Sequence, residues 1–317
     1  MEENKAKTDI QKKSLKQALY DFYEKKYKAL LIIPFLIIVL SIGQIAYQIA
    51  STGDFMKKDV SLKGGITVTI PYDKQVDVNE LEAKIRNEFP LNDITIRTLS
   101  GTAGASGLIF EADIDGNDPV QIDRFIDSIS SNLPIDLKNI DYGLEITGSA
   151  LGASFFRESF IALGFAFLFM SLVVLIYFRS FVPSVAIIAA SFSEMIIALA
   201  VVNIMDIKIG TAGIAAFLML IGYSVDTNIL LTVRVLKRRE GTVQERVVSS
   251  LKTGMTMTLT AIVTAIVGIL LSESEVIRQI MTILLIGLLS DIVFTWIMNV
   301  GLLRMHEEKK AKKLGHG

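Results

Sequence analysis

Three carboxylic acids lie within long apolar stretches, and they are the residues of this 317-residue chain best placed to do chemistry. Asp226, Glu194 and Asp291 each occur inside a run of mainly apolar residues. A charged side chain in hydrocarbon costs roughly 2.5–3.5 kcal/mol on insertion scales, so such residues commonly mark an ion path or a binding site. Asp226 is therefore the first candidate for ion or proton coupling, and Glu194 and Asp291 are secondary candidates.

Asp226 has the most polar surroundings of the three. Tyr223 precedes it by three residues and shares its helix face, and Thr227 and Asn228 follow it directly. Burial disfavours the charged carboxylate, so a carboxyl in this setting can hold a proton and release it when water or a cation arrives. The alternative is a carboxyl that only hydrogen-bonds a neighbouring helix and fixes its packing.

Two other features near Asp226 are each open to two interpretations. Arg234 lies eight residues further on and is followed by more basic residues, so we expect an anchor at the lipid headgroups rather than part of a charge relay. The next apolar run carries threonines whose hydroxyls could line a proton path or bond to a neighbouring helix. These are Thr253, Thr256, Thr258, Thr260 and Thr264.

The elements that must position these residues are six apolar runs in a chain that is 51% hydrophobic, with a mean hydropathy of +0.49. About 20 helical residues, at 1.5 Å each, cross about 30 Å of hydrocarbon. The runs are continuous rather than alternating, which favours helices over a membrane barrel. The sequence therefore predicts an α-helical polytopic membrane protein with six transmembrane helices, at 29–49, 155–178, 181–203, 210–235, 253–272 and 278–303.

Charge placement gives these spans an orientation. The N-terminal segment, the turn at Arg179, the 234–252 connection and the C-terminal tail are rich in Lys and Arg, whereas acids outnumber basic residues in 51–157. The positive-inside rule then places segments 1–28 and 304–317 in the cytoplasm. The first run is long and lacks a small-residue cleavage site, so we interpret it as a retained span.

Residues 50–153 change to short β-type runs and amphipathic helices, as expected of an extracytoplasmic domain. The predicted strands are 66–70, 94–99, 108–112 and 144–147. The predicted helices are 78–87, with Asp77 as its N-cap, and one opened by Asp118-Pro119. This β-α-β-β-α-β order is the ferredoxin-like pattern. The domain has no His or Cys, and its acidic turn lacks a complete calcium loop, so we expect no catalytic centre, metal or cofactor.

The layout and two motifs together resemble the SecD/SecF family of the resistance-nodulation-division superfamily. The fourth apolar run resembles that family's span-4 signature at 213–216 and 220–228, and the Lys-Gly-Gly step at 63–65 is similar to its entry into the first strand. Ser61 stands where an acid is expected, and Val233-Arg234 replaces an Asp-Arg pair. With these departures, the chain resembles an archaeal-type SecF.

This resemblance implies a subunit that pairs with SecD near the SecYE translocon and helps move translocating polypeptides outward, driven by an ion gradient. The resemblance implies that Asp226 is the ion-responsive carboxyl. Arg234 also corresponds to a residue of the family's motif, but its match is weaker. Membrane lipid is an expected partner, and nucleic acid is not. Two alternatives remain, an exporter of small molecules or lipids from the same superfamily and an intramembrane aspartyl protease using Asp226 and Asp291.

Overall fold

The computed structural model of the chain describes residues 26–74, 76–100, 106–133, 141–237, 241–272 and 274–313. Several sequence predictions lie partly outside these residues. They concern the N-terminal segment 1–25, the loop 101–105, the basic residues at 238–239, Glu273 and the last residues of the tail.

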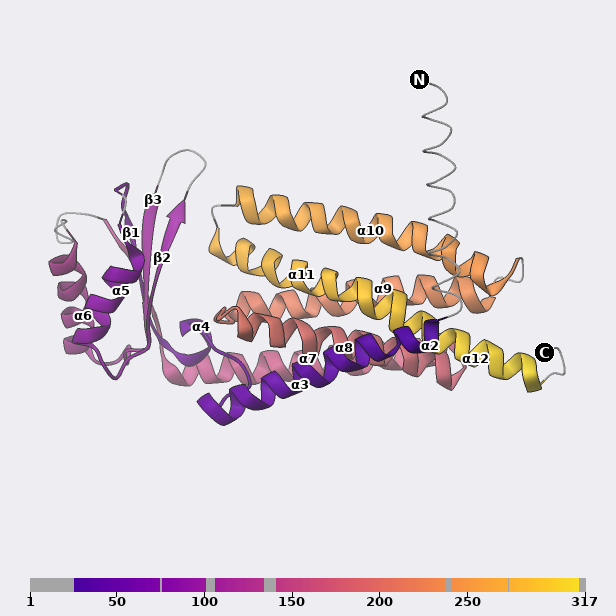
Figure 1. The fold of residues 1–317 in the computed structure, drawn as a ribbon. Helices are drawn as coiled ribbons and strands as arrows, with labels where there is room; N and C mark the ends of the chain where they lie inside the picture. Colours follow the sequence, from indigo (N-terminus) through magenta and orange to yellow (C-terminus); the bar gives the residue numbers. More distant parts are fainter. Residues whose placement is uncertain are drawn as a thin grey trace, which may run out of the picture.

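Six helices among the described residues are long and apolar enough to cross a membrane, and they match the six predicted runs. The first combines α2 and α3, and the last runs through α11, a π-helical segment η2 and α12 (Figure 1). Their bounds are Tyr27–Leu30 (α2), Ile32–Thr52 (α3), Ser149–Phe178 (α7), Phe181–Ile204 (α8), Thr211–Lys237 (α9), Val243–Leu271 (α10), Glu275–Val293 (α11), Phe294–Asn299 (η2) and Val300–Lys313 (α12).

Two of these helices extend well beyond the apolar runs. α10 begins at Val243 rather than near 253, because Thr242 and Glu245 form a capping box that satisfies the first backbone N–H groups. α12 carries the last helix past residue 303, and the Tyr27 hydroxyl donates a hydrogen bond to Glu308 at 2.5 Å. Hydropathy therefore locates the membrane-spanning part, whereas caps and polar contacts decide where each helix ends.

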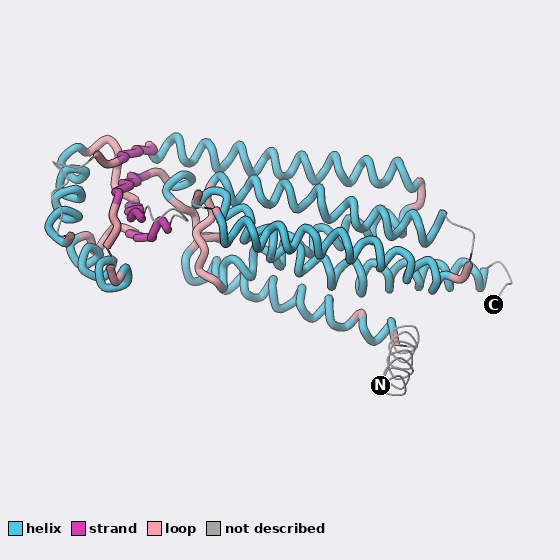
Figure 2. Tube along the Cα trace, turned by 90° about the horizontal axis from the view of Figure 1, so that it is seen from above, coloured by secondary structure: helices cyan, strands magenta, loops and turns pink. Residues whose placement is uncertain are grey.

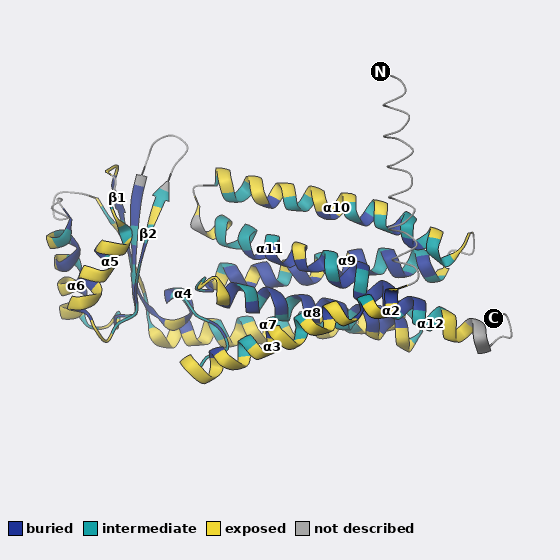
Figure 3. Cartoon of the chain, in the orientation of Figure 1, coloured by how far each residue is buried: buried dark blue, intermediate teal, exposed yellow. Residues whose placement is uncertain are grey.

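The bundle has an inner and an outer set of helices (Figure 3). α8 and α9 are largely buried, whereas α3, α7 and α10 expose long apolar side chains. Phe169 and Leu172 on α7 and Leu36 on α3 are examples of exposed apolar residues. Contiguous apolar surface of this extent is unusual on a soluble monomer and is expected of helices that face lipid.

A four-stranded antiparallel sheet follows α3, with the strand order β2-β3-β1-β4. Two helices cover the face of this sheet that points away from the bundle, as the two views show (Figures 1 and 2). The observed order β-α-β-β-α-β is the predicted one. The bounds are Gly65–Pro71 (β1), Val78–Glu88 (α5), Ile94–Ser100 (β2), Ser106–Ala112 (β3), Pro119–Asn132 (α6) and Gly143–Thr147 (β4).

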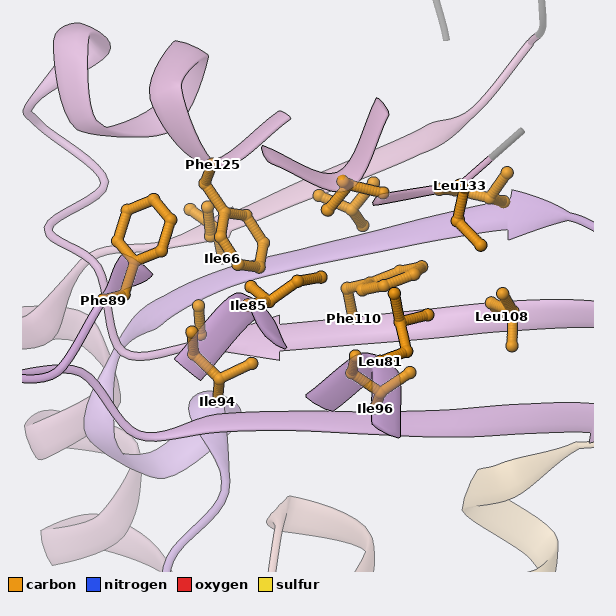
Figure 4. Close-up of a cluster of buried hydrophobic side chains, with 14 of the residues drawn as sticks. Ile66, Leu81, Ile85, Phe89, Ile94, Ile96, Leu108, Phe110, Phe125 and Leu133 are labelled. Carbon is orange, nitrogen blue, oxygen red and sulfur yellow. The ribbon is translucent and has the colours of Figure 1, made fainter. Parts of the chain in front are cut away.

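The core of this α+β unit lies between the sheet and α5 and α6 (Figure 4). Alternate residues of β1 are fully buried, as the period-two pattern predicts. Phe110 on β3 and Phe125 on α6 are among its largest fully buried side chains. The predicted caps are also present, since Asp77 and Asp118 each accept hydrogen bonds from two backbone N–H groups at the start of α5 and α6.

A short segment docks this unit on the bundle. The chain after α3 pairs with the α8–α9 loop, where the Ile209 N–H donates to the Lys57 carbonyl at 2.7 Å. α4 (Val60–Lys63) then packs on α7, and any Cβ at Gly64 would overlap the backbone of Ser149. Gly64 also has a φ of +86°, so the Gly-Gly step is required by both space and conformation.

Asp59 caps α4 at this junction. It accepts hydrogen bonds from the Ser61 N–H at 2.8 Å and from the Ser61 hydroxyl at 2.6 Å. Burial raises the pKa of Asp59 above its ordinary value, against the opposing effect of the Ser61 donors. Ser61 also accepts a hydrogen bond from the Thr211 N–H at 3.1 Å, which ties the cap to the first residue of α9.

Ion pairs reinforce the same junction. The Lys208 ammonium, from the α8–α9 loop, lies 2.8 Å from the Asp93 carboxylate and also bonds the Thr95 hydroxyl. Lys63 lies 3.3 Å from the same carboxylate. Burial alone would raise the pKa of Asp93, but these two ammonium groups outweigh it and hold that pKa below its ordinary value.

We expect Lys208→Ala to loosen the α+β unit from the bundle without unfolding either part. The ion pair is only partly buried and is worth about 1 kcal/mol, so the change should appear as faster proteolysis at the junction rather than as a lost fold. Asp93 has a lowered folded-state pKa, so its contribution is present above its ordinary pKa and is lost as pH falls through the lowered value. The variant and the wild type should therefore converge in strong acid, and a difference that persists there would contradict this account.

Candidate functional site

Helix geometry divides the polar residues around Asp226 between two faces of α9. Residues two apart on a helix are separated by about 200°, so Asp226 and Ser224 or Asn228 point in opposite directions. Accordingly, Asp226 is exposed and Tyr223 is partly exposed, whereas Ser224, Thr227 and Asn228 are buried inside the bundle. The predicted cluster around Asp226 is thus two sites on opposite sides of one helix.

The first site is a groove of about 1160 Å³ between α9, α10 and α11. Asp226 lines it at mid-helix, together with Tyr223, and Lys252 lines it at the α10 end nearest Arg234. The remaining lining residues are Met219, Thr253, Thr256, Met257, Thr260, Ala261, Thr264, Ala265, Met281, Leu284 and Leu288. A carboxyl is therefore presented in a mainly apolar groove with hydroxyls opposite it.

The threonines of α10 differ in what they bond. Thr256, Thr260 and Thr264 each donate to the backbone carbonyl four residues earlier, at 2.8–2.9 Å. Their hydroxyl oxygens can still accept hydrogen bonds from the groove. Thr258 instead faces the bundle interior and donates to the Asp291 carboxylate at 3.4 Å. The series is therefore divided between threonines that line the groove and Thr258, which bonds a neighbouring helix.

Arg234 joins α9 to α10 rather than extending away from the bundle. Its guanidinium donates to the Ser249 carbonyl at 2.8 Å and to the Thr253 hydroxyl at 2.9 Å. This position is near the end of the groove, eight residues from Asp226, which is roughly 12 Å along the helix. Arg234 therefore fixes the spacing of the two helices that border the groove.

The second site is a buried polar cluster on the opposite face of α9. Glu194 from α8 and Asp291 from α11 are both 0% exposed. The Thr295 hydroxyl donates to Asp291 at 2.6 Å, in addition to the bond from Thr258. The Glu194 carboxyl lies beside Ser224, Asn228 and Asp291, yet both of its buried oxygens lack a hydrogen-bond partner among the described residues.

Amide and hydroxyl pairs surround these two acids. The Asn299 amide donates to the Asn228 side-chain oxygen at 2.6 Å, and the Asn228 amide donates to the Ser224 carbonyl at 2.9 Å. The hydroxyls of Ser191 and Ser224 are 2.9 Å apart. Three helices thus meet through polar side chains at the centre of an apolar bundle, where unsatisfied polar groups are costly.

A π-helical segment positions the last of these side chains. η2 begins three residues after Asp291 and contains Thr295 and Asn299. π-Helical turns are rare in proteins overall, and those that occur are often found at functional sites. Trp296 of the same segment packs against Gly254 of α10 so closely that a Cβ there would overlap the indole ring.

The sequence analysis selected Glu194, Asp226 and Asp291 but missed Asn299, Thr295 and Ser191. A readable signal existed, because Asp291, Thr295 and Asn299 follow one another at intervals of four residues and so share one helix face. Ser224, Asn228 and Thr232 repeat that spacing in α9. A polar stripe of this kind inside an apolar run indicates a helix face turned toward other protein.

The chemistry open to these sites is ion or proton binding. No group of three or more His, Cys, Asp or Glu side chains placed to hold a metal ion occurs among the described residues. Carboxyl, amide and hydroxyl groups can bind a proton or a small cation without any further group.

The fold defines a multi-pass membrane protein in which one long helix, a small α+β unit and five further helices follow in order. Residues 130–309 match the family described as protein export membrane protein SecD/SecF, C-terminal. The chain belongs to this family of protein-export membrane proteins, and its relatives include the SecF proteins of two archaea. It is 34% identical to SecF of Pyrococcus furiosus, over 94% of this chain and 97% of the relative. It is 36% identical to SecF of Methanothermobacter thermautotrophicus, over 92% and 97%.

Solved structures agree at the level of fold. SecDF from Thermus thermophilus, described as a translocon-associated membrane protein, superposes with a TM-score of 0.66 at 18% identity. The match covers 90% of this chain and 38% of the SecDF chain. A second SecDF structure, in a super-membrane-facing form, gives a TM-score of 0.54 at 14% identity.

Proposed function

We propose that this protein is a SecF-type subunit that pairs with SecD and assists Sec-dependent export through coupling to an ion gradient. Family membership supports the export role. The match to less than half of a SecDF chain supports a partner that supplies the remainder. The description of SecDF as translocon-associated supports a location beside the SecYE translocon, in contact with the translocating polypeptide.

The observation that carries the proposal is the exposure of Asp226 in the groove between α9, α10 and α11. A carboxylate facing lipid at mid-membrane costs roughly 2.5–3.5 kcal/mol on insertion scales. That cost disappears if a membrane helix of SecD covers the groove and leaves an ion path beside the carboxyl. Asp226 is then the ion-responsive group, Tyr223 and Thr227 flank it, and Arg234 holds α9 to α10.

We further propose that residues 50–153 form a ferredoxin-like domain outside the cytoplasmic membrane, with segments 1–28 and 304–317 inside the cell. The antiparallel order β2-β3-β1-β4 supports the fold, and the distribution of Lys and Arg supports the orientation. The apolar surfaces of α3 and α7 are the proposed contacts with membrane lipid.

We propose no catalytic activity. An aspartyl protease needs two carboxyls close enough to share a proton. Asp226 lines the groove on one side of α9, whereas Asp291 is buried and bonded to Thr258 and Thr295. Each acid thus has a separate environment, which supports binding rather than hydrolysis.

The export role is tested by depleting the chain from its host and by isolating its partners. We expect secreted proteins to accumulate unexported and an affinity-tagged chain to co-purify with SecD. Normal secretion together with impaired efflux of a lipid or small molecule would favour the exporter alternative instead.

The orientation is tested with single cysteines, which is direct because the chain contains none. Leu91→Cys lies on the α+β unit, where Leu91 is 96% exposed, and Lys310→Cys lies on exposed α12. We expect a membrane-impermeant maleimide to label Leu91→Cys in intact cells and Lys310→Cys only after permeabilisation. The reverse pattern would overturn the proposed orientation.

A further inference from the structure

We propose that Glu194 and Asp291 form a buried proton-binding pair, distinct from Asp226, that exchanges its proton with the groove through Tyr223 and Thr258. The inference deepens the proposed ion coupling and rests on it for the pair's role in export. The binding of the proton itself can be measured without any export.

The electrostatic environment of the pair disfavours two negative charges. Both acids are 0% exposed, and they interact with each other across the α8–α11 contact. Two ionised carboxylates side by side in a low-dielectric interior repel each other and lose their hydration. One proton shared by the pair removes that repulsion, as in other carboxyl pairs.

No cation of the described residues neutralises the pair. α3 contains no charged residue, and the charged residues of α7 lie near its first turns, at Arg157 and Glu158. From α9, the titratable group that faces the pair is Tyr223. The basic residues of the other packed helices form hydrogen bonds to groups outside the pair. Arg278 bonds the Ser272 carbonyl, Arg234 bonds Ser249 and Thr253, Arg246 bonds the Val235 carbonyl, Arg304 bonds Gln244, and Lys252 and Asp226 line the groove.

The two acids of the pair differ in the hydrogen bonds that they accept. Among the described residues, both Glu194 oxygens are buried without a hydrogen-bond partner, whereas Asp291 accepts from two threonines. An ionised Asp291 is therefore better stabilised than an ionised Glu194, so the shared proton resides on Glu194.

Tyr223 and Thr258 connect the pair to the groove. Tyr223 lines the groove, yet among the described residues its hydroxyl is buried without a hydrogen-bond partner and lies beside Thr258. Thr258 donates to Asp291. A rotation of the Tyr223 side chain that brings its hydroxyl to groove water completes a relay. Tyr223 and Thr258 each accept one proton and release another, Asp291 receives the proton and passes it to Glu194, and release follows the same route in reverse.

The test is infrared difference spectroscopy of the purified protein, with its partner if they co-purify, during a pH titration. We expect a protonated-carboxyl band that titrates in the wild type, is lost in Glu194→Gln and titrates with a changed midpoint in Asp291→Asn. Glu158→Gln replaces an exposed carboxyl of α7 and should leave the band unchanged. A band that is absent from the wild type, that persists in Glu194→Gln or that titrates unchanged in Asp291→Asn would overturn the proposal.

Exchange of the proton gives a second readout that does not need either acid to be changed. We expect Tyr223→Phe to slow deuterium exchange of the band by about tenfold, equal to a barrier higher by about 1.4 kcal/mol. Tyr177→Phe, at an exposed tyrosine of α7, should not slow it. An unchanged exchange rate in Tyr223→Phe would contradict the proposed route through Tyr223. Loss of the band on adding sodium at constant pH would show that the pair binds sodium instead of a proton and would overturn the proposal. Because these spectra need no translocation, defective secretion with an intact band would separate the two proposals.

Discussion

Cells that carry Asp226→Asn as their only copy of this chain should secrete proteins at nearly the level of cells that lack it. The amide keeps the size of the side chain but cannot exchange a proton or balance a cation in the groove. Asp226 is exposed and forms no hydrogen bond to another helix among the described residues, so the substitution should leave the bundle and the proposed SecD complex intact. Pulse-chase measurement of secretion, with co-purification of SecD from the same cells, checks both parts.

Two controls make this result specific. Glu158→Gln makes the same carboxyl-to-amide change on exposed α7 and should secrete normally. Asp226→Glu keeps the carboxyl and should retain part of the activity. Normal secretion by Asp226→Asn with a stable complex would contradict a coupling role for this residue.

Phe110→Ala should have the largest effect on stability. Phe110 is 0% exposed at the centre of the α+β core, and truncating such a side chain costs about 3–5 kcal/mol from lost burial and the cavity left behind. Small domains are stable by about 5–15 kcal/mol in total, so this unit should become partly unfolded at growth temperature. Limited proteolysis of the full-length protein should then cleave within 50–153 while the membrane helices stay protected.

The matched control for Phe110→Ala is Leu91→Ala. Leu91 is 96% exposed, so its truncation should change stability by no more than about 0.5 kcal/mol. Equal protease sensitivity of the two variants would show that the α+β unit does not depend on the core described here. Secretion by Phe110→Ala should also fall, because the proposed domain outside the membrane would no longer present a folded surface.

Local patterns explain why much of the architecture was predictable. The alternation of Ile66, Val68 and Ile70 and the caps at Asp77 and Asp118 depend only on neighbouring residues, and the structure confirms them. The six apolar runs are similarly local. Sheet order depends on pairing between strands that are distant in the sequence, and the docking of Lys208 on Asp93 joins residues 115 positions apart. No local pattern specifies either contact.

The candidate site was predictable in its acids but not in its arrangement. The 100° step per residue already separates Asp226 from Asn228, whereas the partner of each face depends on how the helices pack. Asn299 reaches Asn228 from η2, the π-helical segment that continues α11. A π-helical turn of this kind has no sequence signature as clear as a cap or an apolar run.

The two polar sites suggest how one helix could serve two tasks. α9 presents Asp226 to the groove, where a partner is proposed to bind, and Asn228 to the buried acids. Thr258 of α10 contacts the inner site, while its neighbours Thr256 and Thr260 line the groove. A shift of α10 relative to α9 would therefore change both sites together.

The most direct test of the central claim is ion-driven translocation by the reconstituted complex. Proteoliposomes would contain the translocon and the purified complex of this chain with SecD, and proton and sodium gradients would be imposed separately. We predict that one of the gradients stimulates export of a secreted polypeptide with the wild-type chain and that neither does so with Asp226→Asn. Equal stimulation of both proteins, or none of the wild type under either gradient, would contradict the claim that Asp226 couples an ion gradient to export.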